Sequence, residues 1–222
     1  MHHEVLIVDD HPLYRAALKG AVATACADVE FFEADSVDGL FGALERHPHA
    51  DLLLLDLNLP GARGFNALAY LRGVFPQLPV IVVSATDDAR TVRRALAFGA
   101  QGFIPKSADA GSIGRSVRAL LRGEDVAPKD LDPTGAPAAD ADALDTAQRM
   151  SQLTTQQFRV FGMLCAGRLN KQIGYDLNIT EATVKAHVTA ILRKLGAANR
   201  TQAVLLAGRL ARQPEGRTGT GQ

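Results

Sequence analysis

The stretch LLLLDLNLPG, residues 52 to 61, decides how the chain folds. Its four leucines predict a strand that is buried on both faces, and Pro60 and Gly61 predict a turn soon after it. Asp56 stands where this apolar strand ends. A carboxylate in that position either caps the loop that follows or is a nucleophile at the open edge of a sheet. Both interpretations remain open from this stretch alone.

Similar apolar runs alternate with helical patterns on both sides of this stretch. Strands are expected at 4–8, 29–32, 51–55, 79–84 and 102–104. Helices are expected from near Pro12, from about Ser36, from about Gly64, over 87–98 and over about 109–121. Five strand–helix units of this kind predict an α/β fold, a doubly wound five-stranded parallel sheet with helices on both faces. In such sheets the functional site lies beyond the carboxyl ends of the strands.

Polar residues follow these carboxyl ends. Asp9 and Asp10 follow the first strand, and Asp56 ends the third. In the strand order 2-1-3-4-5 these two strands are neighbours, so the three carboxylates should converge, and Mg²⁺ is the cation that best fits such oxygen ligands. Ser84 and Lys106, at the ends of the fourth and fifth strands, can donate to phosphoryl oxygens. Together the five residues predict phosphoryl transfer to Asp56.

Each of these residues also has a purely structural interpretation. Asp10 could cap the helix that starts near Pro12, Ser84 could bind a loop amide, and Lys106 could be solvated. Their occurrence together at one sheet edge favours a site. A single histidine beside two carboxylates is a weak metal signal, so His11 is expected to be an ordinary loop residue.

Two classes of enzyme could place an aspartate or a lysine in this way. A phosphate-binding P-loop needs glycine directly before its lysine, whereas Pro105 precedes Lys106 here. Phosphatases of the haloacid-dehalogenase type use a second Asp, two residues after the nucleophile, as a general acid. That position holds Asn58, whose amide cannot do acid–base work near neutral pH. We therefore expect a protein that keeps its phosphoryl group as a signal and is not an enzyme.

Residues 1–122 resemble the receiver domain of bacterial two-component response regulators, a CheY-like fold. The resemblance is carried by DD at 9–10, LDLNLPGARG at 55–64, SA at 84–85 and GAQGFIPK at 99–106. It implies that a partner sensor histidine kinase phosphorylates Asp56. It also implies roles for the surrounding residues: a Mg²⁺ site formed by Asp9, Asp10, Asp56 and the main-chain carbonyl of Asn58, phosphoryl contacts from Ser84 and Lys106, and an aromatic switch at Phe103.

The formal net charge of zero hides an uneven distribution. Residues 1–122 carry −2, residues 123–150 carry −5 and residues 151–222 carry +7. The middle segment is rich in Pro, Ala and Asp, which predicts a flexible acidic linker over 123–150 with some helix near its end. The Gly/Thr-rich tail, 212–222, is expected to be disordered. The basic third segment suggests a module that binds a polyanion, and a merely solvated basic face is the alternative.

Residues 151–211 predict four helices. Their boundary signals are Thr154 and Gly167 for the first helix, Asn170 and Asp176 for the second, and Thr180 and Gly196 for the third, with Asn178 in the turn between the second and third. A short helix, a tight turn and a longer helix form a helix-turn-helix. The third helix places Val184, Val188, Ile191 and Leu195 at core spacing, and opposite them Ala182, Ala186, Thr189 and Arg193, with Lys185 on the flank.

This region resembles the LuxR-type DNA-binding domain, as found in NarL/FixJ-like regulators. The resemblance is carried by LTTQQ at 153–157, NKQI at 170–173, TVKAHVTAILRKLG at 183–196 and NRTQA at 199–203. It implies that Lys185, Ala186 and Thr189 face DNA bases, with Thr183, His187 and Arg193 nearer the DNA backbone. Gln157 and Gln172 stand where family members usually have Glu paired with basic groups. A four-helix protein-interaction module is the alternative.

We therefore expect a two-domain transcription regulator that is controlled by phosphorylation and binds promoter DNA as a homodimer when phosphorylated. The alternatives are a DNA-binding regulator whose receiver acts without phosphorylation and an Asp-nucleophile phosphatase. No apolar run approaches the roughly 18 residues of a membrane span, and the N-terminus lacks signal-peptide features, so no membrane partner and a cytoplasmic location are expected. Cys26 and Cys165 are expected to be buried, reduced thiols.

Overall fold

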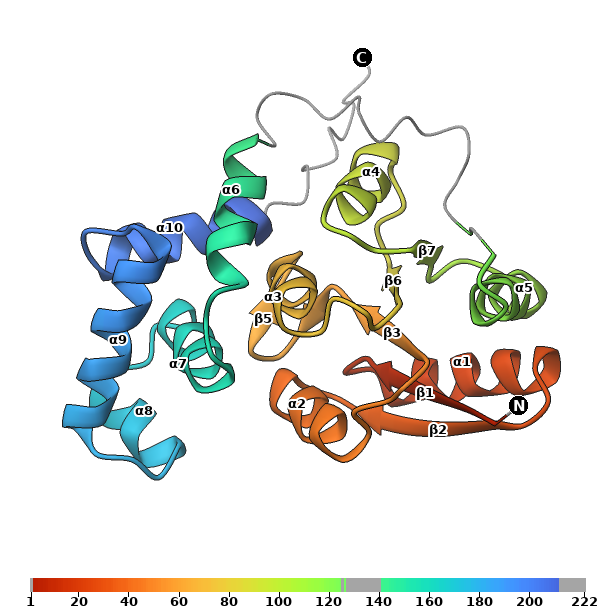
Figure 1. Cartoon of the computed structure of the whole chain (residues 1–222), viewed down its shortest axis with the longest axis horizontal. Coiled ribbons are helices and arrows are strands. Elements are labelled where there is room, and N and C mark those ends of the chain that lie inside the picture. Colours follow the sequence, from red (N-terminus) through yellow and green to blue (C-terminus); the bar gives the residue numbers. More distant parts are fainter. Residues whose placement is uncertain (1, 125, 127–140, 212–222) are drawn as a thin grey trace, which may run out of the picture.

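The computed structural model describes residues 2–124, 126 and 141–211, which form an α/β half and a helical half (Figure 1). The predictions made for residues 127–140 and for the tail 212–222 lie outside these described residues. Among the residues that are described, no helix has both the length and the apolar composition to cross a lipid bilayer.

The α/β half is built on a five-stranded parallel sheet in the order β2-β1-β3-β6-β7. Its strands are β1 (His3–Val8), β2 (Val29–Ala34), β3 (Leu52–Asp56), β6 (Val80–Ser84) and β7 (Gly102–Pro105). Two further strands, β4 (Asn58–Leu59) and β5 (Ala62–Arg63), form a separate small hairpin after β3. With the hairpin set aside, the observed order is the predicted 2-1-3-4-5, so the predicted doubly wound fold is confirmed.

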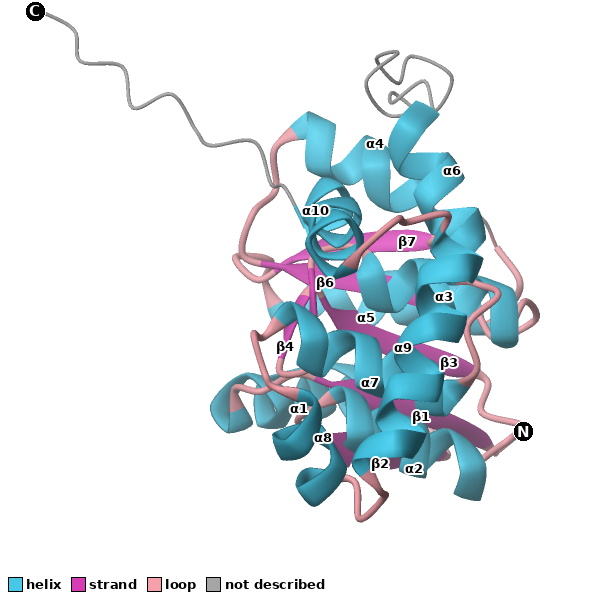
Figure 2. Ribbon diagram, turned by 90° about the vertical axis from the view of Figure 1, so that its left-hand side faces the viewer, coloured by secondary structure: helices cyan, strands magenta, loops and turns pink. Residues whose placement is uncertain are grey.

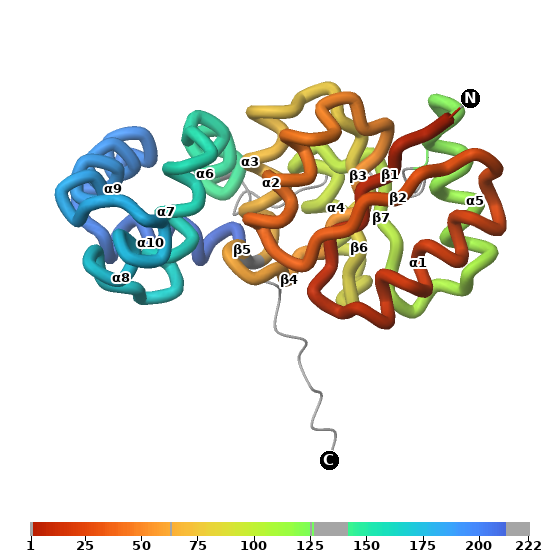
Figure 3. Tube along the Cα trace, turned by 90° about the horizontal axis from the view of Figure 1, so that it is seen from below, coloured from red at the N-terminus to blue at the C-terminus, as the bar shows by residue number. Residues whose placement is uncertain are grey.

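Helices cover both faces of the sheet (Figure 3). The helices are α1 (Pro12–Ala25), α2 (Val37–Arg46), α3 (Asn66–Val74), α4 (Ala89–Ala97) and α5 (Ala110–Leu121). Helices α1 and α5 pack on one face with Leu52 and Leu54, whereas α2, α3 and α4 pack on the other with Leu53 and Leu55. All four leucines are buried, because successive side chains of a strand point to opposite faces and both faces are covered here.

Helix boundaries follow from local capping chemistry. The side chains of Ser36, Asp88 and Asp109 each accept a backbone N–H at the start of α2, α4 and α5, and Pro12 is the first residue of α1. Helix α3 begins at Asn66, two residues after the predicted start at about Gly64, and the hairpin β4–β5 lies between β3 and this helix.

The helical half contains α6 (Ala141–Met150), α7 (Thr155–Cys165), α8 (Asn170–Asp176), α9 (Glu181–Leu195) and α10 (Arg200–Ala211). Thr154 and Thr180 cap α7 and α9, and Gly196 ends α9 with a positive φ of 66°, as predicted. Asn178 adopts the left-handed conformation expected of it, with φ 52°. The predicted cap at Asn170 was wrong by one residue. Leu169 holds the cap position of α8, and its N–H donates to the side chain of Gln172 at 2.9 Å.

Helix α6 lies within the segment predicted as a linker, near its end, where some helix was expected. It buries Ala143, Ala147 and Met150 and packs against α3, α9 and α10. Helix α6 thus contacts the α/β half through α3 and the rest of the helical half through α9 and α10.

The two halves pack through α2, α3 and the β4–β5 hairpin on one side and α6, α7 and α10 on the other (Figures 1 and 3). At the centre the rings of Tyr70 and Phe158 stack with centroids 4.3 Å apart, and the Tyr70 hydroxyl donates to Thr155 Oγ1 at 3.0 Å. Helices α8 and α9 lie on the side of the helical half that faces away from the sheet (Figures 1 and 2). The main contacts across the interface therefore come from elements other than the predicted DNA-binding helix.

The two cysteines are free, and the prediction that both are buried was wrong. Cys165 is exposed and Cys26 is partly buried.

Candidate functional site

An acidic cluster lies where β1 and β3 end. Because these strands are paired neighbours, Asp9 directly after β1 and Asp56 at the end of β3 come together. Both side chains are almost fully buried, at 1% and 2% exposed, whereas Asp10 is more open. Ligand atoms of Asp9, Asp10, His11 and Asp56 all lie within 4.8 Å of one another, which is close enough to hold one divalent cation.

Lys106 bridges the two buried carboxylates. Its Nζ atom lies 2.6 Å from Asp9 Oδ2 and 3.2 Å from Asp56 Oδ2. The main chain holds the lysine in place, since Lys106 N donates to Ser84 O at 2.7 Å. Its side chain also contacts an aromatic ring, with Nζ 5.0 Å from the centroid of Tyr14. One ammonium therefore partly neutralises two carboxylates that would otherwise repel each other.

Burial raises the pKa of the Asp56 carboxyl above its ordinary value, and the neighbouring charge of Asp9 adds to the rise, while Lys106 opposes it. Burial, followed by the charges of Asp9 and Asp56, also raises the pKa of Tyr14 to about 12. Asp56 Oδ1 is buried and accepts no hydrogen bond from any residue that the structure describes. A buried carboxylate oxygen without a hydrogen bond is rare in folded proteins and is free to accept a cation or a covalent bond.

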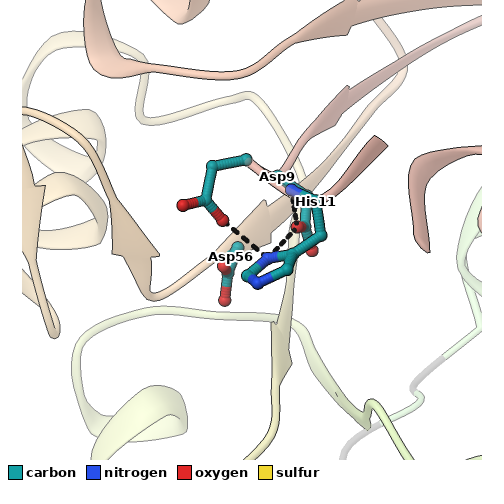
Figure 4. Close-up of side chains that lie close together, drawn as sticks. Asp9, His11 and Asp56 are labelled. Carbon is teal, nitrogen blue, oxygen red and sulfur yellow. Dashed lines mark hydrogen bonds and ion pairs between the residues drawn. The ribbon is translucent and has the colours of Figure 1, made fainter. Parts of the chain in front are cut away.

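His11 lies in the loop before α1, as expected, and its side chain also contacts this cluster. Its Nδ1 lies 2.7 Å from Asp10 Oδ1 and 3.1 Å from Asp9 Oδ1, and its main-chain N–H donates to Asp9 Oδ1 at 2.8 Å. Figure 4 shows the imidazole beside the Asp9 carboxylate, with Asp56 close by. Pro12 fixes the helix start and so keeps His11 in the turn next to the acids, but the sequence carries no signal for the direction of its side chain.

The other predicted residues of the receiver site lie after β3 or on the strands β6 and β7. Ser84 is fully buried at the end of the neighbouring strand, and its Oγ accepts the N–H of Thr86 at 3.1 Å. The backbone of Asn58 lowers the pKa of the Asp56 carboxyl, against the larger effect of burial, so it lies close to that carboxyl. Phe103, on β7, is partly buried and packs against the larger apolar core. The structure thus brings Ser84 and Asn58 to the same sheet edge as the acids and places Phe103 on the strand that leads to Lys106.

The predicted DNA-binding residues form one face of α9. Of the six residues, His187 is partly buried. The other five are exposed: Thr183, Lys185, Ala186, Thr189 and Arg193. On the opposite face Val184, Ile191 and Leu195 are buried. Lys185 Nζ pairs with Glu181 one turn earlier at 3.0 Å. This division into a core face and an exposed polar face is the one that the spacing predicted.

Gln157 takes the place of a usual glutamate and retains a basic partner. Its Oε1 accepts from Lys194 Nζ at 2.7 Å and from the Thr154 N–H at 3.1 Å. The first contact joins α7 to the end of α9, and the second completes a capping box. An amide thus makes the hydrogen bonds of the absent carboxylate without its charge.

Two family matches cover most of the chain. Residues 5–118 match the response regulator receiver domain, and residues 151–207 match the bacterial regulatory proteins of the luxR family. The first match ends within α5, and the second begins just after α6.

Relatives with curated names match over nearly their full length. The glycerol metabolism activator of Pseudomonas putida is 39% identical over 210 residues, covering 93% of this chain and 95% of that protein. The nitrate/nitrite response regulator protein NarL of Escherichia coli K12 is 31% identical over 202 residues, covering 90% of this chain and 93% of that protein. The DNA-binding transcriptional activator DevR/DosR of Mycobacterium tuberculosis is 31% identical over 214 residues, covering 94% of this chain and 95% of that protein.

Among solved structures, RcsB from Salmonella enterica serovar Typhimurium bound to promoter P1flhDC matches with a TM-score of 0.55. The match covers 95% of this chain and 100% of that one at 20% sequence identity, so the likeness concerns the fold alone.

Proposed function

Because the chain belongs to the NarL/FixJ family of response regulators, which join a receiver domain to a LuxR-type DNA-binding domain, we propose that Asp56 receives a phosphoryl group from a partner sensor histidine kinase. A carboxylate oxygen of Asp56 attacks the phosphorus of a phosphohistidine, the P–N bond breaks, and the imidazole of the kinase leaves. The observation that carries this proposal is the position of Lys106 between Asp9 and Asp56, beside a carboxylate oxygen that lacks a hydrogen bond within the described chain.

The acidic cluster would hold Mg²⁺ through Asp9, Asp10, Asp56 and the main-chain carbonyl of Asn58. The fit is supported by the burial of two carboxylates that only one ammonium partly neutralises. A bound Mg²⁺ would neutralise negative charge on the phosphoryl oxygens. Lys106 and the Ser84 hydroxyl would donate to the same oxygens, and Phe103 would respond to the movement of Ser84 as the switch residue.

The test is the intact mass of the protein after incubation with a small phosphodonor and Mg²⁺. The wild-type chain should gain one phosphoryl group, and Asp56→Ala should gain none. Asp87→Ala is a matched control, because Asp87 is exposed in the loop after Ser84 and lies outside the cluster. Labelling of Asp56→Ala would show that the acceptor is another residue. A wild-type chain that is never labelled would favour a regulator whose receiver acts without phosphorylation.

DNA would be bound by the exposed face of α9, with Lys185, Ala186 and Thr189 toward the bases and Thr183, His187 and Arg193 toward the phosphates. The charge of +7 in residues 151–222 supports this assignment, as does the position of α9 away from the α/β half. One recognition helix makes few base contacts, so specific binding would need two copies of the chain on a pseudo-palindromic promoter site.

The signal would pass from Asp56 to the helical half through the loop that follows it. The carbonyl of Gly61 in this loop lies against Gly162 of α7, where an added Cβ would approach it to 2.2 Å. Phe65 N, at the end of the loop, donates to Leu210 O of α10 at 3.2 Å. A loop that is rearranged by phosphorylation would therefore loosen these contacts, release the helical half and promote the homodimer.

A further inference from the structure

We propose that His11 is an additional ligand of the divalent-cation site, which therefore accepts a transition-metal ion such as Mn²⁺ through an imidazole nitrogen as well as carboxylates. This inference rests on the proposed cation site and adds a residue to it.

The first support is the direction of the His11 side chain. His11 holds the position before α1, where a side chain commonly caps the helix, but it makes no capping hydrogen bond within the described chain. Its imidazole instead reaches the carboxylates of Asp9 and Asp10. The ring is 67% exposed, so apolar packing does not account for this orientation.

The second support is the spacing of the donor atoms. His11 Nδ1 lies 2.7 Å from Asp10 Oδ1 and 3.1 Å from Asp9 Oδ1. Adjacent ligands of an octahedral ion with bonds of about 2.1 Å are separated by roughly 3.0 Å. The nitrogen and the two oxygens are therefore spaced as neighbouring vertices of one coordination sphere. A carboxylate oxygen of Asp56 lies within 4.8 Å of the ligand atoms of the other three residues, and Asp56 Oδ1 is buried without a hydrogen-bond partner among the described residues.

The third support is the chemistry of the donors. Carboxylates and carbonyls suit Mg²⁺ and Mn²⁺ alike, so they do not distinguish the two ions, whereas an imidazole nitrogen is a ligand of first-row transition metals, most of all the later ones, and adds little for Mg²⁺. The contribution of His11 should therefore appear in the affinity for Mn²⁺ and be small in the affinity for Mg²⁺. A His11 that only donates a hydrogen bond to the carboxylates would have the opposite effect, since an entering cation would have to displace it.

The experiment uses the full chain loaded with Mn²⁺, with electron spin-echo envelope modulation to detect a coordinated ¹⁴N nucleus and calorimetry to measure affinity. The wild-type protein should show the ¹⁴N modulation of a bound imidazole. His11→Gln should lose it and bind Mn²⁺ about tenfold or more weakly, with a smaller change for Mg²⁺. His49→Gln is the matched control, since His49 is exposed and outside the cluster, and it should behave as wild type.

Bound Mn²⁺ without ¹⁴N modulation would overturn the inference, as would unchanged or tighter Mn²⁺ binding by His11→Gln. In those cases the carboxylate site of the proposed function would still stand. Loss of binding in Asp56→Asn identifies the cluster as the site measured. If the wild-type chain binds neither Mn²⁺ nor Mg²⁺, the proposed cation site and the role of His11 both fail.

Discussion

The rings of Tyr70 and Phe158 stack across the boundary between the two halves of the chain, with centroids 4.3 Å apart and planes inclined by 29°. Tyr70 lies on α3, the helix that follows the loop after Asp56, and Phe158 lies on α7 of the DNA-binding half. Phe41 meets both rings edge-on. The DNA-binding half is thus packed against the elements next to the loop that follows Asp56.

Gly162→Ala should open this interface without touching the acidic cluster. The new Cβ would lie 2.2 Å from Gly61 O, so the halves must move apart, while alanine favours the helix itself by about 1 kcal/mol. Small-angle X-ray scattering should give a larger radius of gyration, with helical content unchanged by circular dichroism. Gly20→Ala is the control, because a Cβ there meets no described atom within 4 Å. An unchanged radius for Gly162→Ala would mean that this contact does not hold the halves together.

Asp56→Asn should stabilise the cation-free protein at neutral pH. Burial raises the pKa of Asp56 in the folded state, so the folded chain holds this proton more tightly than the unfolded chain. The free energy of unfolding therefore falls as pH rises from the ordinary value of 3.8 through the folded pKa, and the ionised carboxylate costs stability above that window. Asparagine carries no such charge.

Thermal unfolding in a chelator measures this effect. The midpoint of Asp56→Asn should exceed that of wild type at pH 7, and the gap should close as the pH is lowered toward 3.8. Asp87→Asn, an exposed substitution in a nearby loop, should show no gap. A lower midpoint for Asp56→Asn at pH 7 would contradict the assigned direction of the pKa.

Lys106→Ala should accept a phosphoryl group yet fail to transmit the signal. Asp56 remains as the acceptor, but the ionic contact from the phosphoryl group to the residue after β7 is lost. Intact mass should show labelling, and DNA affinity should be the same with and without label. Lys19→Ala, which removes a surface partner of Glu33, should respond as wild type does. A label-dependent rise in the DNA affinity of Lys106→Ala would place the switch elsewhere.

Gln157→Glu should stabilise the helical half by about 0.5–1 kcal/mol, because it gives Lys194 a charged partner and places an acid in the first turn of α7. Gln156→Glu adds the same charge to that turn without the recorded contact to Lys194, so it isolates the helix-dipole contribution. The difference between the free energies of unfolding of the two variants, measured by chemical denaturation, is the contribution of the ion pair between the new carboxylate at position 157 and Lys194. Equal stability of both variants would show that the Lys194 contact contributes nothing beyond the amide hydrogen bond.

The fold was predictable because buried parallel strands leave a strong pattern. Residues 52–55 and 80–83 are apolar without interruption, since helices cover both faces of the sheet. The hairpin β4–β5 has two residues in each strand, too short for any alternation to show. The cap of α8 was misplaced because Asn170 is a common cap residue, whereas the capping contact is made by Gln172 to the Leu169 N–H.

The arrangement of the two halves could not be predicted. Phe41, Tyr70 and Phe158 fit the apolar pattern of their own helices, and such a pattern tells that a side chain is buried but not which element covers it. The same limit applies to His11. Its place beside the acids depends on the turn before α1 and on a side-chain direction that spacing does not encode.

Phosphorylation of Asp56 is expected to raise DNA affinity by promoting a dimer. Moving the chain from about 1% to about 99% in its active, dimer-forming state needs about 5.5 kcal/mol of differential stabilisation. A few charge-assisted hydrogen bonds to the phosphoryl group, of roughly 1.5–3 kcal/mol each, can supply much of that.

The isolated fragment 151–222 lacks the receiver, so it should bind the same DNA weakly, with a steep salt dependence and without regulation. Because α6 packs against α9 and α10, a fragment from residue 141 is the matched comparison.

The most direct test titrates the full chain, with and without the phosphoryl group, against a DNA site obtained by selection from random sequences, with the dimer fraction measured in parallel by sedimentation. We expect the phosphorylated chain to form more dimer and to bind the site more tightly, and Asp56→Ala to show neither change. Equal dimer fractions together with equal DNA affinities for the two forms would contradict the mechanism, even though both domain assignments would stand.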